Sequence, residues 1–422
     1  MQKHVQNELP PPLDLSGWRK APSVLMAIGG ILSLIGLIAS PSEFAYSWLL
    51  SFMFFLTLSL GALAFVFIHH LSDAGWSVAT RRVNEHLASL LFPWLAILFL
   101  PVGILATVLA TKFPQVTQLY HWMSLPATDP SVVVKWPVFT IPGFWVTSAI
   151  FFAIWWLMTG RINYWSLRQD VTGEPVCTYR MRFYSGWGIV VLGLMMYVAP
   201  VLWMQAIEHR WYSAEYGVYY FASCGWLALA TIYILMVLMQ RQRILDRVLH
   251  DHSFYFIGTL LFAFTLFQAY DEFAQYFVVW NANMPQETFW YLIREHGSWW
   301  GISLLLIFGH FMLPFFILLP IRVKMNFKIM VPICLWAWFM SFTDLAFNIL
   351  PGVSPDRYPF QWIWLHLGCF IFMLGFLSCV FLKKFLSHPP YPQRDPRVLE
   401  AMGIGLEPEE LPGTLPDEGG AQ

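Results

Sequence analysis

Long apolar runs separated by short polar connections fill the sequence from residue 22 to residue 385. Because about 20 consecutive apolar residues are needed for an α-helix to cross a bilayer, each run predicts one membrane-spanning helix. The pattern predicts ten helices, at residues 22–39, 46–68, 87–109, 143–166, 183–205, 216–240, 255–280, 298–319, 327–350 and 361–385. It therefore predicts an all-α integral membrane protein.

A weak internal repeat suggests how these helices are grouped. Helices two and six lead into similar connections, residues 81–92 and 241–256, in which basic residues precede an acidic residue and a histidine. Internal repeats are common in membrane proteins, so we expect two four-helix bundles, helices two to five and six to nine, with two flanking helices. The predicted regions are an N-terminal arm (1–21), a flanking helix (22–45), two bundles (46–205 and 206–350), a last helix (351–388) and a tail (389–422).

Composition and charge limit the classes of function. The chain has 422 residues, of which 58% are hydrophobic and 12% charged, whereas a soluble domain carries about a quarter charged residues. The net charge of −1 gives no basis for nucleic-acid binding. With the N-terminus inside, the inner segments hold 19 of the 24 Lys and Arg residues, and this bias predicts that both termini are cytoplasmic.

The two ends of the chain lack the features of folded or processed segments. The first twenty residues have no apolar core and no small-residue cleavage site, so we expect no removable signal peptide. The tail from residue 389 is rich in Pro, Gly, Asp and Glu and poor in apolar residues. Such a composition favours an extended cytoplasmic arm rather than a folded unit.

Cysteine and histidine spacing gives no cofactor motif. Neither CxxC nor CxxCH occurs, and adjacent residues such as His69 and His70 cannot both point at one haem face. No Walker A, GxSxG or HExxH motif is present. The five cysteines are scattered: Cys177, Cys224, Cys334, Cys369 and Cys379. We therefore expect no haem, metal, flavin or iron–sulfur cluster in this chain, and no catalytic residue.

Ionisable residues gather where the second predicted helix ends and the third begins. His69 and His70 end one helix, and Arg81 and Glu85 precede the next. Histidine titrates near neutral pH, so this group could take up protons from the cytoplasm. The alternative is a hydrated interfacial loop held by an Arg–Glu pair, since charge at the interface costs little.

A second set of ionisable residues lies within apolar runs, where a charge costs a few kcal/mol or more and functional residues are common. It comprises Asp271, Glu272, His310 and Asp344. Asp271 and Glu272 are adjacent in the outer half of the seventh helix, where repelling carboxyl groups could carry a proton. The alternative is that one reaches the outer interface and the other is hydrogen-bonded within the bundle.

His310 and Asp344, the other two residues of this set, each have a residue one turn further along the helix that affects their surroundings. Pro314 lacks the amide that would bond the carbonyl of His310, so the backbone opens beside the imidazole. That is a place for a water or a proton relay, unless His310 is a core histidine satisfied by one neighbour. Asp344 has Asn348 one turn further along the same face, and a lone buried carboxyl in a membrane helix seldom serves packing alone.

Several longer strings carry a resemblance to a known family. They are HHLSDAGWSVATRRVNEH, EHRWYSAEYGVYYF, FAQYFVVWNANMPQETFWY, GHFMLPFFILLPIRVK, SFTDLAFNILP and YPQRDPRV. In this order the sequence resembles the F subunits of bacterial alternative complex III, over most of the chain from about Ala45 onward. These subunits belong to the polysulfide-reductase membrane-subunit family, which has ten helices and two four-helix bundles. Where Asp271 and Glu272 stand, the family pattern has uncharged residues, and it has aromatic residues where Ala346 and Phe347 follow Asp344.

The resemblance implies a place in a respiratory complex of the bacterial inner membrane. The complex would be a quinol:cytochrome c, or high-potential iron–sulfur protein, oxidoreductase. This chain would be a scaffold and proton-conducting subunit without its own redox cofactor, with quinol such as menaquinol as a candidate ligand. Expected partners are a homologous C-type membrane subunit, periplasmic iron–sulfur and multihaem cytochrome c subunits, small membrane subunits and lipids, with a terminal oxidase as a further candidate.

Two rival functions stay open at this stage. One is a quinone-site membrane anchor of a polysulfide- or nitrite-reductase-like complex, and the other is a proton-coupled transporter, which the lack of a solute-sized polar constellation disfavours. Our hypothesis is a proton route in two halves. The inner half starts at His69, His70, Arg81 and Glu85, and the outer half runs through His310, Asp271, Glu272 and Asp344.

Overall fold

The computed structural model describes residues 20–113, 116–245, 248–249 and 251–398. All regular secondary structure in these residues is helical. Ten helices are long and apolar enough to cross a membrane. The prediction of an all-α, multi-pass membrane protein with ten spans is therefore confirmed.

The first five spans occupy the chain from Lys20 to Trp203. They are α1 (Lys20–Ala39), α2 (Pro41–Ser72), a bent helix made of α3 (Val78–Ala88), η2 (Leu91–Leu95) and α4 (Ala96–Lys112), then α6 (Ile141–Thr172) and α7 (Pro175–Trp203). Short helices η3 (His121–Ser124), α5 (Pro130–Val133) and η4 (Gln205–Glu208) lie in the connections.

The second five spans follow with a similar pattern. They are α8 (Tyr216–Arg241), α9 (Asp251–Ala282), a helix made of α11 (Gly297–Leu305), η5 (Leu306–Met312) and α12 (Leu313–Leu318), then α14 (Phe327–Ile349) and α15 (Ile363–Leu386). Their connections contain α10 (Pro285–Arg294), α13 (Ile321–Lys324), η6 (Leu350–Gly352) and η7 (Phe360–Trp362).

Capping residues at several helix starts explain where these spans begin. The Ser40 side chain accepts a hydrogen bond from the amide of Glu43, and Thr140 and Asn326 cap α6 and α14 in the same way. Such side chains satisfy one of the amides that a helix start leaves without a partner. At the end of α6, Gly173 has a φ of 68°, a conformation that glycine adopts without a steric penalty.

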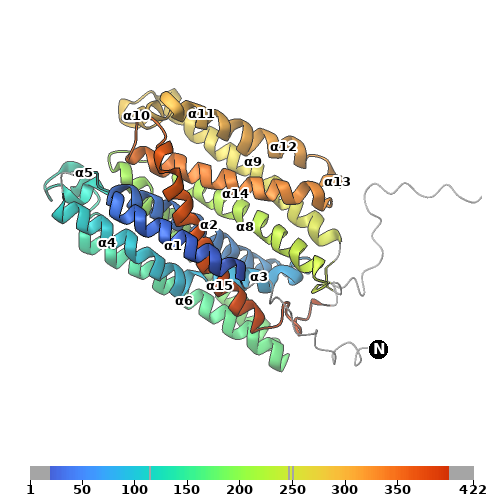
Figure 1. The fold of residues 1–422 in the computed structure, drawn as a ribbon. Coiled ribbons are helices and arrows are strands. Elements are labelled where there is room, and N and C mark those ends of the chain that lie inside the picture. Colours follow the sequence, from blue (N-terminus) through green and yellow to red (C-terminus); the bar gives the residue numbers. More distant parts are fainter. Residues whose placement is uncertain (1–19, 114–115, 246–247, 250, 399–422) are drawn as a thin grey trace, which may run out of the picture.

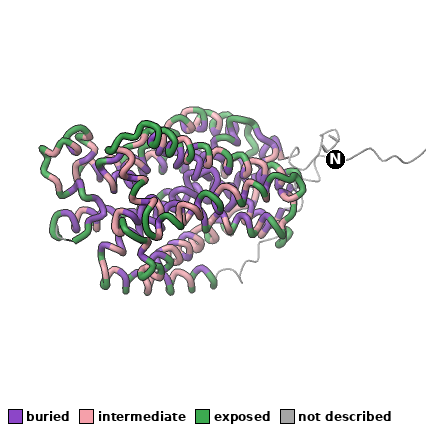
Figure 2. The backbone as a smooth tube through the Cα atoms, turned by 90° about the horizontal axis from the view of Figure 1, so that it is seen from above, coloured by how far each residue is buried: buried purple, intermediate pink, exposed green. Residues whose placement is uncertain are grey.

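The helices form two groups around a central pair. α2 packs against α3, α4 and α7 on one side, while α8 packs against α9 and α14 on the other. α2 and α8 contact each other, and every residue in the most apolar stretch of α2 is buried. Figure 2 shows this buried centre surrounded by an exposed outer layer. The division into two separate four-helix bundles stays a prediction.

The flanking helices α1 and α15 cover α2 from outside and lie against each other (Figure 1). A Cβ atom added at Gly29 would lie 2.2 Å from the backbone nitrogen of Phe372, and one at Gly375 would lie 2.4 Å from that of Met26. The two backbones therefore approach as closely as small residues allow, which is a common way for membrane helices to associate.

Both ends of the described chain, Lys20 and Val398, lie at the end of the molecule that also carries α3 and α13 (right in Figure 1). We call this the inner end, and the opposite end, with α5 and α10, the outer end. The N-terminal arm, apart from its last two residues, lies outside the described residues. The same is true of the tail from residue 399.

At the inner end, the structure differs from the prediction in two segments, the start of the third span and the beginning of the tail. The third span begins at Val78 rather than at residue 87, so Arg81 and Glu85 lie within a helix. Both are almost fully buried, so the segment is not a hydrated loop, although the Arg–Glu pair of that alternative is present between Arg81 and Glu85. The predicted extended tail is wrong for residues 389–398, because this segment packs against the inner end and buries Asp395.

Candidate functional site

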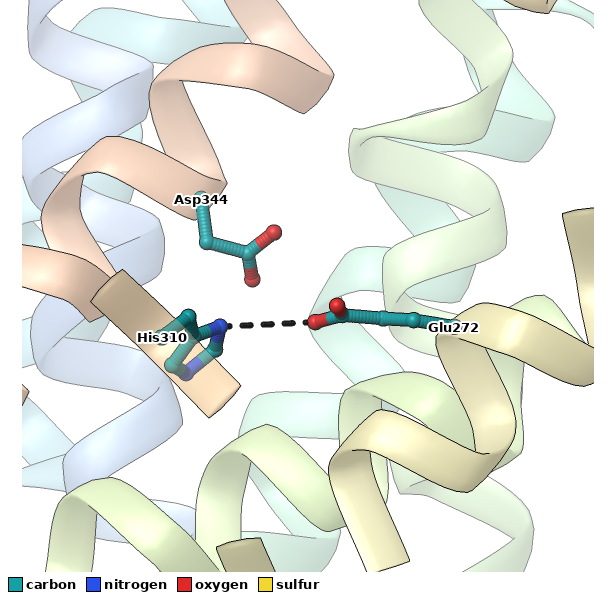
Figure 3. A group of neighbouring side chains, drawn as sticks. All are labelled: Glu272, His310 and Asp344. Carbon is teal, nitrogen blue, oxygen red and sulfur yellow. Dashed lines mark ion pairs between the residues drawn. The ribbon is translucent and has the colours of Figure 1, made fainter. Parts of the chain in front are cut away.

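Three ionisable side chains meet inside the second helix group. Glu272 comes from α9, His310 from η5 and Asp344 from α14, and one ligand-type atom of each lies within 4.8 Å of the others. We call these residues the outer cluster. His310 Nδ1 is 3.4 Å from Glu272 Oε1, and Figure 3 shows the Asp344 carboxylate turned towards the same space. His310 and Asp344 are buried.

A local change of helix type positions His310. In η5 the helix widens to a π-turn, in which the amide of Leu313 donates to the carbonyl of Phe308. Pro314 has no amide to donate in the next turn, and the Trp336 indole donates to the Gly309 carbonyl at 2.7 Å instead. π-Turns of this kind are frequent at functional sites. The sequence indicated an opened backbone here but not its form.

The two carboxylates are held by neighbouring side chains. The Tyr219 hydroxyl donates to Asp344, and Asn348 Nδ2 lies 3.4 Å from Asp344 Oδ1. Gln268 Nε2 donates to Glu272 Oε1 at 3.1 Å. These partners fix the directions of the carboxylates from α8, α9 and α14.

The imidazole of His310, by contrast, is held only loosely. Its Nδ1 lies 3.4 Å from Glu272 Oε1, and neither of the two buried ring nitrogens makes a well-aligned hydrogen bond with another described residue. The ring lies 4.3 Å from the ring of Trp226, tilted by 64°. Its Nδ1 therefore faces the carboxyl groups of Glu272 and Asp344.

Asp271 does not join the outer cluster, although it precedes Glu272 in the sequence. Its side chain is buried, and its Oδ2 has no hydrogen-bond partner among the described residues. Adjacent residues on a helix do not face the same direction. The structure thus brings together three of the four residues that the sequence suggested for the outer half.

One histidine and two carboxylates are also residue types that bind transition metals. In the described part of the chain, no other group of three or more such side chains comes as close together. The expectation that the chain holds no metal, haem or flavin stays a prediction.

The inner end contains a second set of buried charges, dominated by ion pairs. Arg81 Nε donates to Glu85 Oε1 at 2.9 Å, and Arg82 Nη1 donates to Glu85 Oε2 at 3.0 Å. Arg82 also pairs with Asp170 on α6, and Arg81 pairs with Asp395. The Arg81, Arg82, Glu85 and Asp395 side chains have no exposed surface.

The C-terminal segment extends this network to the end of α2. Arg397 pairs with Asp395 at 3.1 Å and with Asp73 at 2.7 Å, and Asp73 also pairs with Arg182. We call the eight connected residues the inner network: Arg81, Arg82, Arg182, Arg397, Asp73, Glu85, Asp170 and Asp395. It contains four basic and four acidic side chains, so its charges balance.

Two carboxyls of this network lie outside the spans and are held in the ionised form. The hydrogen bond from Arg182 lowers the pKa of Asp73 below its ordinary value. Burial alone would raise the pKa of Asp395, but the neighbouring His69, Arg81 and Arg397 outweigh burial and hold it well below its usual range. Both groups therefore act as fixed negative charges at neutral pH.

The two histidines of α2 lie beside this network. His69 Nδ1 is 2.6 Å from the Ser77 hydroxyl, and its Nε2 is 3.9 Å from Asp395 Oδ2, too far for a hydrogen bond. His70 is fully buried, and neither of its ring nitrogens has a hydrogen-bond partner. Of the predicted inner residues, His69, Arg81 and Glu85 thus meet around Asp395, whereas His70 stays separate.

A cavity of about 140 Å³ lies next to His69, between the two helix groups. Its walls are mainly apolar, and Arg81 and Asn84 add polar groups. His69 Nε2 and Asn84 Oδ1 are buried without a hydrogen-bond partner. The remaining lining residues are Phe65, Ile68, Trp76, Ser77, Thr80, Leu229, Ile232, Ile257, Leu260 and Phe264.

Sequence reasoning missed several residues that complete these sites, among them Tyr219, Asp170 and Asp395. Tyr219 and Asp395 lie in strings quoted for the family resemblance, but neither showed a pattern of its own. Asp170 lies close to a predicted helix end, where charge is common. A partner that depends on contacts between distant segments leaves no signal in local spacing.

Fold and sites together define a multi-pass α-helical membrane protein with buried charge at both ends of its helix bundle. The sequence matches no protein-family model, and no curated protein matches it.

Proposed function

We propose that this protein is a proton-conducting membrane subunit, without a redox cofactor of its own, of a quinol:electron-acceptor oxidoreductase. The complex would be of the alternative complex III type, in a bacterial inner membrane with both termini cytoplasmic. The observation that carries proton conduction is the outer cluster. In it, a buried imidazole that makes no well-aligned hydrogen bond with the described residues lies beside two carboxylates, within helices long enough to cross a membrane.

The chemistry of the outer cluster suits proton transfer. His310 Nδ1 and Glu272 Oε1 are 3.4 Å apart, so a proton could pass directly from one atom to the other after a small approach of the two side chains. From the opposite side, the Tyr219 hydroxyl donates to Asp344, and Asn348 Nδ2 donates to Tyr219 at 3.0 Å. Tyr216 donates to Asn348 in turn, so polar contacts continue along α8 and α14 towards the outer end.

The inner end supplies a matching entry. At about 30 Å³ for each water, the cavity beside His69 has room for roughly four waters. Water there would satisfy His69 Nε2 and Asn84 Oδ1, which are buried without partners. The cavity contacts helices of both groups, which a route from the inner network to the outer cluster has to connect.

The assignment to a quinol-oxidising complex rests on the sequence resemblance. The strings that carry it hold His69, Arg81, Tyr219, His310 and Asp344, and these residues fold into the two sites. The resemblance and the buried charges therefore concern the same parts of the molecule. A quinone-site anchor of a polysulfide- or nitrite-reductase-like complex is the second candidate, and the cavity beside His69 is the feature that would suit it.

Asp344→Asn tests the proton route. The amide keeps the shape of the side chain and removes its titration. Because positioned acid–base groups contribute roughly 10²–10⁴-fold to proton transfer, we expect the proton flux through this subunit to fall at least about tenfold. The measurement is proton release per electron in the reconstituted complex, with quinol oxidation followed in parallel. If the variant assembles and both quantities are unchanged, Asp344 is structural and the outer half-route is wrong.

Copurification tests the assignment to a complex separately. A tagged chain isolated from its native membrane should bring c-type haem and iron with it, while the isolated polypeptide should hold neither. If the chain purifies alone under mild conditions, the assignment fails whatever Asp344 does.

A further inference from the structure

The segment that follows α15 is an integral part of the inner network. Asp395 and Arg81 are 314 residues apart in the sequence, and their charged groups are in direct contact with no exposed surface. The Gln393 amide donates to Asp170 at 3.0 Å, and Arg397 Nη1 lies 3.5 Å from the carbonyl of His69. The segment thus contacts α2, α3 and α6.

We infer that residues 389–398 form a lid over the inner end of the proton route, and that Asp395 is the positioning residue that holds this lid closed. Asp395 faces Arg81 and Arg397 and lies 3.9 Å from His69. Behind His69 and Arg81 lies the cavity. With the segment in place, His69 is buried from the aqueous side.

Charge balance explains why Asp395 is decisive. Arg81 has two acidic partners, Glu85 and Asp395, while Glu85 is shared with Arg82. Loss of the Asp395 charge leaves one buried guanidinium charge in excess, and a buried charge without a partner is strongly unfavourable. Undocking the segment relieves this excess, because water then reaches Arg81. A neutral residue at position 395 should therefore shift residues 389–398 from the docked to the undocked state.

The lid itself does not depend on the proposed proton conduction, but its role in controlling proton entry does. The experiment separates the two by measuring access and proton release in the same variants. A cysteine at Thr80→Cys reports on access, because Thr80 lines the cavity and is buried. Cys379 is half-exposed and is replaced by Ser in all variants, while the other four cysteines are buried.

The variants compare Asp395→Asn with Asp395→Glu, which restores the charge, and with Asp356→Asn, the same change at an exposed outer-end residue. A membrane-impermeant maleimide is added from the inner side of oriented vesicles that contain the full chain in its complex. We expect position 80 to react at least tenfold faster in Asp395→Asn than in the parent. Asp395→Glu and Asp356→Asn should react like the parent.

Each outcome decides a different point. Equal labelling in Asp395→Asn and the parent overturns the lid. Faster labelling with unchanged proton release keeps the lid but removes the inner half of the proposed route. Should Asp395→Asn fail to accumulate, Arg397→Gln replaces it, because this change keeps the Arg81–Asp395 pair and removes the contacts with Asp73 and the His69 carbonyl. It should also speed labelling, and an unchanged rate contradicts the inference.

Discussion

The two buried charge sites of this protein are built on opposite principles. The inner network pairs four arginines with four carboxylates, and its residues hold one another through ion pairs. The outer cluster has two carboxylates and one histidine, with no lysine or arginine among them. The arginines of the inner network stay charged at all ordinary pH values. The outer cluster instead contains a histidine, the residue type whose side chain commonly gains or loses a proton at physiological pH.

This difference suggests that the inner network stabilises the fold and that the outer cluster serves the proposed proton transfer. A buried ion pair adds little net stability, but removing one partner leaves a charge that the interior cannot solvate. The inner network therefore ties α2, α3, α6 and α7 to the C-terminal segment and resists change. In the proposed route through the outer cluster, a proton would move between Nδ1 and a carboxylate without leaving a permanent charge unpaired. The comparison predicts stability defects at the inner end and proton-transfer defects at the outer end.

Glu85→Gln should have the largest effect on stability. Glu85 bonds Arg81, Arg82 and Ser166, and its side chain is fully buried. Losing one partner of a buried ion pair costs about 3–5 kcal/mol, so the variant should accumulate poorly or unfold at a clearly lower temperature in detergent. Glu174→Gln is the matched control, because Glu174 forms a half-exposed pair with Arg168 at 3.4 Å. A Glu85 variant as stable as this control would show that the inner network is not structural.

His310→Asn should give the opposite result. The amide keeps a donor near the position of Nδ1 but cannot titrate. Since His310 makes no well-aligned hydrogen bond with the described residues, the stability loss should be about 1–2 kcal/mol, from the ring atoms that pack against Trp226. Proton release per electron should fall as in Asp344→Asn, with assembly retained. Normal proton release in a stable His310→Asn variant would place the histidine among packing residues.

The sequence was sufficient for the ten spans because a bilayer demands about 20 apolar residues for each helix, whatever the tertiary contacts. It was also sufficient to select His310 and Asp344, since charge in an apolar run is conspicuous. Helix phase alone could have separated Asp271 from Glu272, because neighbouring positions on a helix point in different directions.

The inner end was harder to predict because its pairs join distant segments. Arg81 and Arg82 are expected at a helix boundary on grounds of cost alone, and nothing local shows that Asp170 and Asp395 neutralise them. The tail composition favoured an extended arm. The ion pairs of Asp395 and Arg397 dock residues 389–398 together with Tyr391, which packs against the apolar core.

The lid should open in acid. Since the docked carboxyl of Asp395 has a pKa below its ordinary value, the undocked state binds more protons as pH falls. The docking free energy is thus fully present above the ordinary pKa of about 3.9 and declines below it. The pKa of Asp73 is shifted in the same direction.

Hydrogen exchange of residues 389–398 should be constant from neutral pH to about pH 5 and rise in stronger acid, after correction for intrinsic rates. Asp395→Asn should exchange fast throughout, and a parent-like profile would exclude control by this carboxyl.

Asp271→Asn should have the smallest effect, and it tests the comparison from the other side. Asp271 is buried in the same turn of α9 as Glu272, but it lies outside the outer cluster and forms no ion pair with another described residue. The Oδ2 atom of this buried carboxyl has no hydrogen-bond partner among the described residues, and an amide in its place removes a group that is costly to bury when charged. We therefore expect an unchanged or slightly higher unfolding temperature, together with normal quinol oxidation and proton release.

Glu272→Gln, one residue further on, should reduce proton release, because Glu272 faces His310. If Asp271→Asn impairs proton release as strongly as Glu272→Gln, the route includes both carboxyls, and proximity to His310 is not what selects the residues that carry protons.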